Sequence, residues 1–212
     1  MILLIFGDSI AYGCWDEEGG WVSRLRKFVD KKVIASNFEY YAVVYNLGIT
    51  LGMNTNDILA RFDSETKSRV SGDKDIAFIF AIGINDSQFI NKEGAFVVPP
   101  EQFQTNIRKL MQKAQKFSDK IVFLGLTPVD DLKVDPIPWS PANSYKNEYI
   151  EKFNEIIKKE CAKNRVDFIE IFEKMKKINY QKLLTDGVHP NTQGHKLIFE
   201  VIRDYLIDKG WV

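Results

Sequence analysis

The sequence predicts an α/β protein of three layers, in which a parallel sheet of about five strands lies between two layers of helices. Short runs of apolar and β-branched residues alternate with segments whose apolar residues recur at helical spacing. One run, residues 76–82, is nonpolar throughout, which is typical of a strand buried on both faces of a parallel sheet. Because strands that alternate with helices favour right-handed crossovers, we expect one parallel sheet.

The individual elements follow from these patterns in order along the chain. Strands are predicted where apolar or β-branched residues run together, at residues 2–6, 40–47, 76–82, 121–126 and 166–171. Helices are predicted where apolar residues recur every three to four positions, at residues 20–31, 54–69, 103–117, 149–157 and 197–206. The connection over residues 127–142 contains four prolines and Trp139, and connections of that length are often functional.

The length of 212 residues favours a single domain over residues 1–212, because a single hydrophobic core extends to roughly 250 residues before chains divide into domains. The chain has 29 basic and 29 acidic residues. This balance gives no reason to expect nucleic acid or an anionic membrane as a partner. The sequence does not indicate an oligomeric state.

We expect a cytoplasmic protein without stable membrane insertion. No stretch reaches the ~18 apolar residues of a membrane helix. The first apolar run, residues 2–6, is shorter than the roughly 7–15 residues of a signal-peptide core and follows no basic region. Cys14 and Cys161 share no C-x-x-C spacing, which favours a reducing compartment over a disulfide. Two histidines and two scattered cysteines give no zinc signature, and His195, inside the predicted last helix, is expected to be structural.

Polar residues gather where the predicted strands end. Ser9 follows the first strand, Asn46 to Gly48 closes the second, and residues 83–86 follow the third. A fourth polar cluster, residues 186–189, precedes the last helix. Because the carboxyl ends of parallel strands meet at one edge of a sheet, we expect all four clusters to line one pocket.

The residue types in these clusters predict an acyl-transfer site. Ser9 is the candidate nucleophile and His189 the base that takes its proton, because a serine hydroxyl needs an oriented base. Asp186, three residues before His189, can hold one imidazole nitrogen so that the other faces Ser9. We expect the oxyanion donors to be the backbone N–H groups of Ser9 and Gly48 and the side-chain amide of Asn85.

These motifs resemble those of the SGNH hydrolases, also called the GDSL family of esterases and lipases. The four letters of the name correspond to Ser9, Gly48, Asn85 and His189, with Asp186 as the acid of the last block. The matching blocks are residues 6–9 with Gly13, residues 46–48, residues 83–86 and residues 186–190. The resemblance implies a flavodoxin-like fold and ester hydrolysis through an acyl-enzyme, with no metal or organic cofactor.

The motifs do not choose among substrates. We expect a small-molecule ester, with short acyl groups preferred; a carbohydrate O-acetyl esterase, a thioesterase and a lysophospholipase are alternatives within the family. Non-catalytic alternatives are a flavodoxin-like ligand-binding module, which the absence of Gly-x-Gly-x-x-Gly and P-loop motifs disfavours, and an inactive relative that binds glycans. The predicted pocket walls are the aromatic side chains of Tyr12, Trp15, Phe89, Phe96 and Trp139.

Overall fold

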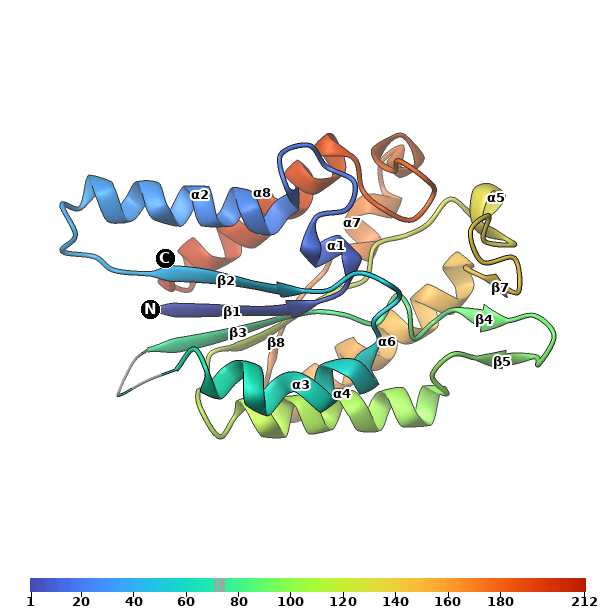
Figure 1. Ribbon diagram of the computed structural model, residues 1–212, viewed down its shortest axis with the longest axis horizontal. Helices are drawn as coiled ribbons and strands as arrows, with labels where there is room; N and C mark the ends of the chain where they lie inside the picture. The colour runs from blue at the N-terminus through green and yellow to red at the C-terminus, as the bar shows by residue number, and fades with distance from the viewer. Residues whose placement is uncertain (71, 73–74) are drawn as a thin grey trace.

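A computed structural model describes residues 1–70, 72 and 75–212 of the chain. Its centre is a five-stranded parallel sheet in the order β2-β1-β3-β6-β8 (Figure 1). This is the strand order of flavodoxin-like sheets, so the predicted fold class is confirmed. The strands are β1 (Ile2–Gly7), β2 (Val43–Gly48), β3 (Ile76–Ala81), β6 (Ile121–Leu124) and β8 (Asp167–Ile169).

Helices cover both faces of this sheet. Helices α2 (Gly20–Ala35) and α8 (Thr192–Asp208) pack together on one face (Figure 1). The other face carries α3 (Thr55–Lys67), α4 (Pro100–Ala114) and α6 (Asn147–Asn164). Shorter helical segments are α1 (Ser9–Tyr12), α5 (Asp131–Val134), α7 (Phe172–Lys176) and the 3₁₀ turn η1 (Tyr180–Leu183). Within the described part of the chain, none of the helices is both long and apolar enough to cross a lipid bilayer.

The two central strands are the most deeply buried. Every residue of β1 is buried, as is every residue of β3 except its last. Aromatic rings extend this core across the sheet, with Phe80 stacked on Phe123 at a centroid distance of 4.6 Å. Phe6 lies 5.0 Å from Phe62 of α3, which fixes that helix against the first strand. The continuous apolar runs in the sequence therefore correspond to strands covered on both faces.

A second, small antiparallel sheet lies beyond the carboxyl end of the main sheet and is not predicted by the sequence (Figure 1). Its strands are β4 (Phe89–Ile90), β5 (Ala95–Phe96) and β7 (Asn143–Ser144), each too short to show a periodicity. Phe89 and Phe96 both pack against Tyr149 of α6 at 5.2 Å. Neither phenylalanine is among the residues that line the cleft around Ser9, so the prediction that both form pocket walls is wrong; they pack the small sheet against α6 instead.

Candidate active site

A tight turn from β1 into α1 positions Ser9 at the carboxyl edge of the sheet. Asp8 caps the helix, and its Oδ1 accepts the N–H of Ile10 at 2.9 Å. A Cβ atom at Gly7 would lie 2.4 Å from the Ala11 Cβ, so only glycine permits this close turn. Burial raises the pKa of Asp8 to about 6 despite that backbone hydrogen bond. Ser9 is thus the first residue of α1, directly after the buried cap residue Asp8.

Three of the predicted residues form one hydrogen-bonded chain. The Ser9 hydroxyl lies 2.9 Å from Nε2 of His189, although the two residues are 180 positions apart. Nδ1 of His189 lies 2.6 Å from Oδ2 of Asp186. Because a carboxylate only accepts, Nδ1 carries the imidazole proton and Nε2 is left to accept from Ser9. This is the arrangement in which a histidine can act as a base toward a serine.

The carboxylate of Asp186 has a hydrogen-bond donor at each of its four acceptor positions. Oδ1 accepts the backbone N–H groups of Val188 at 3.0 Å and His189 at 2.8 Å. Oδ2 accepts the indole N–H of Trp15 at 3.1 Å in addition to His189. Burial alone would raise the pKa of Asp186, but the hydrogen bonds from His189 and Val188 outweigh it and lower the pKa to about 2. Asp186 is therefore ionised at neutral pH.

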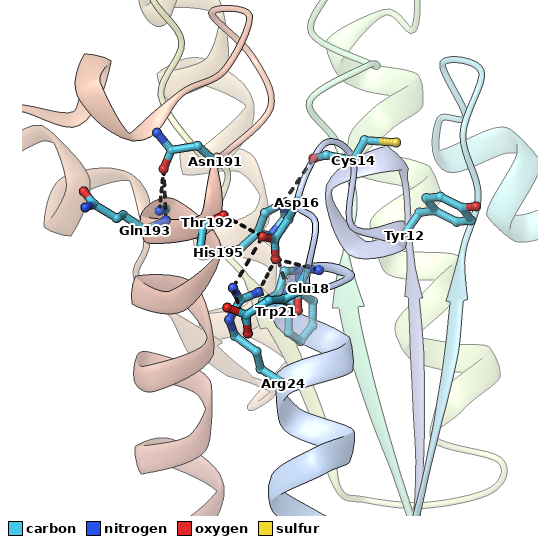
Figure 2. A network of polar contacts seen from close by, with 12 residues as sticks. Tyr12, Cys14, Asp16, Glu18, Trp21, Arg24, Asn191, Thr192, Gln193 and His195 are labelled. Atoms are coloured by element: carbon cyan, nitrogen blue, oxygen red, sulfur yellow. Dashed lines mark hydrogen bonds and ion pairs between the residues drawn. The ribbon is translucent and has the colours of Figure 1, made fainter.

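A network of polar contacts joins the loop that carries Trp15 to both α2 and α8 (Figure 2). The buried carboxylate of Asp16 pairs with the guanidinium of Arg24 on α2. It also accepts the hydroxyl of Thr192, at the start of α8, at 2.9 Å. Burial opposes the ionisation of Asp16, but these two donors hold its pKa well below the usual range. Thr192 follows His189 by three residues, so this network connects the loop of Trp15 with the segment that carries His189.

The second histidine, His195, lies beside Asp16 in this network (Figure 2), and its ring nitrogens contact Trp21 and Cys14. Nδ1 of His195 accepts the backbone N–H of Trp21 at 3.3 Å, and Nε2 donates to the carbonyl of Cys14 at 3.1 Å. Burial lowers the pKa of His195, which keeps the imidazole neutral and lets Nδ1 act as an acceptor. The contacts agree with the structural role that the sequence predicts.

Asn85 is buried, lines the same cleft as Ser9, and has an amide that is held at both ends. Nδ2 donates to the carbonyl of Met53 at 2.8 Å. Oδ1 accepts the hydroxyl of Tyr145 at 2.6 Å and an amide N–H of Gln88 at 3.2 Å. An amide nitrogen carries two hydrogens, so one N–H of Asn85 remains after the bond to Met53.

Gly48 does not reach the pocket. Its N–H donates to the Asn46 side chain at 2.9 Å. A Cβ atom at Gly48 would lie 2.3 Å from the Tyr12 nitrogen, so this glycine allows α1 to approach β2 rather than a substrate to approach the backbone. The glycine that does line the pocket is Gly52, in a left-handed conformation with φ of +72°. The predicted oxyanion role of Gly48 therefore conflicts with the position of its N–H.

These side chains open into one cleft of about 730 Å³. Its lining includes Ser9, Asn85, Asp186 and His189 and, of the predicted aromatic walls, Tyr12, Trp15 and Trp139. More than half of each of these three aromatic side chains is exposed. The ring centroids of Trp15 and Trp139 lie 5.9 and 6.2 Å from that of His189. The cleft is thus an open one with indole rings beside the candidate base.

Comparison with known proteins places the chain in a family. The model of the GDSL-like lipase/acylhydrolase family matches residues 5–197. The chain belongs to this family. It is accordingly a carboxylic ester hydrolase, and the resemblance found in the sequence motifs is confirmed. A search of curated proteins returned no match.

Solved structures share the fold of this acylhydrolase at low sequence identity. A lipase/acylhydrolase from Enterococcus faecalis is 18% identical, with a TM-score of 0.75 over 98% of this chain and 96% of that chain. An acetylxylan esterase from Geobacillus stearothermophilus is 20% identical, with a TM-score of 0.68 over 95% of this chain and 91% of that chain. Another acetyl xylan esterase is 18% identical, with a TM-score of 0.71 over 97% of this chain and 100% of that chain.

Several residues of the acylhydrolase site were not predicted from the sequence. These are residues of the cleft and its supports that carry no motif of their own: Thr50, Leu51, Gly52, Met53, Gln88, Ser140 and Tyr145. A signal for one group existed, because the long connection 127–142 is unusual for a compact domain and contributes Trp139 and Ser140. Across the described residues, no group of three or more His, Cys, Asp or Glu side chains is arranged to hold a metal ion.

Proposed function

We propose that this acylhydrolase is a serine esterase that cleaves small esters, with short acyl groups preferred, through an acyl-enzyme on Ser9. The single observation that carries the proposal is the hydrogen-bonded chain from Ser9 through His189 to Asp186. Ser9 Oγ attacks the acyl carbon while Nε2 of His189 takes the hydroxyl proton. Asp186 stabilises the imidazolium, which then protonates the leaving alcohol. Water attacks the acyl-enzyme by the same route and releases the acid and free Ser9.

The negative charge on the tetrahedral intermediate requires donors beside Ser9. We assign the backbone N–H of Ser9 and the remaining amide N–H of Asn85, as the sequence predicts. The third donor is the N–H of Gly52 in place of Gly48, because Gly52 lines the cleft and the Gly48 N–H is already bonded to Asn46. Removing one such donor costs on the order of 10²–10³ in rate.

The shape of the cleft supports small substrates. It is open, and its volume of about 730 Å³ falls within the range of small-molecule sites. A carbohydrate acetyl ester is a second candidate, because the exposed indoles of Trp15 and Trp139 flank His189 and could stack on a sugar ring. Two solved structures with this fold are themselves described as acetyl xylan esterases, which favours testing that substrate.

Hydrolysis of p-nitrophenyl esters from acetate to palmitate tests the proposal, with wild type beside Ser9→Ala. We expect activity on the shortest esters and its loss in Ser9→Ala, while the melting temperature stays near that of wild type. Ser64→Ala, on the exposed surface of α3, is the matched control and should keep full activity. If Ser9→Ala turned over substrate as fast as wild type, the assignment of Ser9 as the nucleophile would be wrong. A clear preference for palmitate would overturn the short-chain assignment, and faster turnover of acetylated xylo-oligosaccharides would favour the second candidate.

A further inference from the structure

Four side chains form a continuous hydrogen-bonded chain from the small sheet to the cleft. Nδ2 of Asn143, on β7, donates to Oε1 of Gln88 at 3.0 Å. Nε2 of Gln88 lies 2.5 Å from the hydroxyl oxygen of Tyr145. That hydroxyl lies 2.6 Å from Oδ1 of Asn85, beside Ser9. The chain therefore begins on an element that the family motifs do not include and ends on the proposed oxyanion donor.

The pairing of β4 with β7 brings these residues together. In that antiparallel ladder, Phe89 lies opposite Ser144 and Ile90 lies opposite Asn143. Continuing the same register by one residue sets Gln88 opposite Tyr145. The side chain of Tyr145 contacts both Gln88 and Asn85, which lies in the turn after β3. The small sheet thus supplies a fixed frame for groups that contact Asn85.

In each hydrogen bond between these four side chains, only one of the two groups can be the donor. The Met53 carbonyl only accepts, so the nitrogen of Asn85 must face it and Oδ1 must face Tyr145. Oδ1 also only accepts, so the Tyr145 hydroxyl donates to it and accepts from Gln88. Burial raises the pKa of Tyr145, so the phenol keeps the proton that it donates. The amide of Asn85 is left with one N–H for the cleft.

We propose that Tyr145 is a positioning residue of the oxyanion site, which fixes the amide of Asn85 so that its free N–H points at the developing charge. The inference rests on the proposed function, because it assumes that Asn85 is an oxyanion donor. Tyr145 cannot itself supply that donor, since its only proton is bonded to Oδ1 of Asn85. Its contribution to the rate is therefore made entirely through Asn85.

A double-mutant cycle on Tyr145→Phe and Asn85→Ala tests this, with kcat and KM measured on p-nitrophenyl acetate. Tyr145→Phe removes both bonds of the hydroxyl, of which only the neutral hydrogen bond to Oδ1 holds Asn85, so we expect kcat to fall about threefold to tenfold with KM unchanged. Asn85→Ala should lower kcat by on the order of 10²–10³. In the Asn85→Ala background, Tyr145→Phe should cause no further loss, because the group that it positions is gone. Tyr149→Phe is the matched control, because Tyr149 lies on α6 and takes no part in the hydrogen bonds that link Asn143 to Asn85.

The outcomes distinguish failure of the oxyanion role of Asn85 from failure of the positioning role of Tyr145. If Asn85→Ala keeps the wild-type kcat, the oxyanion assignment fails, and the inference falls with it. If Asn85→Ala is slow but Tyr145→Phe is silent, or lowers kcat by the same factor in both backgrounds, the inference alone is overturned. A rise in KM with kcat unchanged would show that Tyr145 binds substrate instead. Should Tyr145→Phe fold poorly, Gln88→Met removes the donor to the Tyr145 hydroxyl together with the direct bond from Gln88 to Oδ1 of Asn85, and it should lower kcat in the wild-type background only.

Discussion

Replacing Asp186 by Asn should change both the rate and the pH dependence of stability. The pKa of this carboxyl is about 2 in the folded protein against an ordinary value of 3.8. Each pKa unit corresponds to about 1.4 kcal/mol, so ionisation of Asp186 contributes about 2 kcal/mol to the free energy of unfolding at neutral pH. The side chain is 23% exposed, so solvent screens this contribution only modestly. The pKa is lowered on folding, so the contribution is present above pH 4 and is lost as the pH falls toward 2.

Urea unfolding of wild type and Asp186→Asn between pH 6 and pH 3 measures this contribution. The stability difference between the two proteins should shrink by roughly 1 kcal/mol, about half of the total, by pH 3. Ser9→Ala, which keeps the carboxylate, should differ from wild type by a constant amount. In parallel, kcat of Asp186→Asn should fall by on the order of 10⁴, because an amide N–H toward Nδ1 favours the wrong imidazole tautomer. A stability difference that does not change with pH would refute the pKa argument.

Two further substitutions probe the supports of the site. Gly48→Ala should lower the unfolding free energy by at least about 2 kcal/mol in thermal melts, because its Cβ would lie 2.3 Å from the Tyr12 nitrogen of α1; an unchanged melting temperature would contradict the packing role. Asp86→Asn should gain stability relative to wild type as the pH rises from 5 to 8. Burial raises the pKa of Asp86 to about 7, so ionisation at higher pH costs wild type stability that the amide does not lose. Urea midpoints that differ equally at both pH values would exclude this.

The fold and the residues of the candidate triad could be predicted because their signals are local. Each main strand is a compact apolar run, and Ser9 and Asn85 directly follow two of them. Parallel topology then brings the ends of these strands together whatever their separation in sequence. Asp186 and His189 are close in sequence, so their mutual hydrogen bond needs only one turn of the chain. The ends of elements are predicted less accurately: β2 begins at Val43 rather than at residue 40.

The glycine of the proposed oxyanion site is a case in which residue spacing does not give the position. Gly48 is the last residue of β2, and Gly52 follows it by four positions. Their difference depends on which neighbour already occupies the backbone N–H and on where α1 packs. Gly48 is bonded to Asn46 and lies under Tyr12, whereas Gly52 faces the cleft. Neither fact is visible in residue spacing, because each arises from contacts between separate segments.

The direction of a hydrogen-bonded chain is a still less local property. Asn85 is recognisable in the sequence, but the orientation of its amide is set by the Met53 carbonyl on one side and Tyr145 on the other. Tyr145 acquires its partner through a two-residue ladder that is too short to predict. The acylhydrolase site therefore has two parts with different origins. Loops at the strand ends supply Ser9 and Asn85, and the small sheet supplies the side chain that holds the Asn85 amide in the proposed direction.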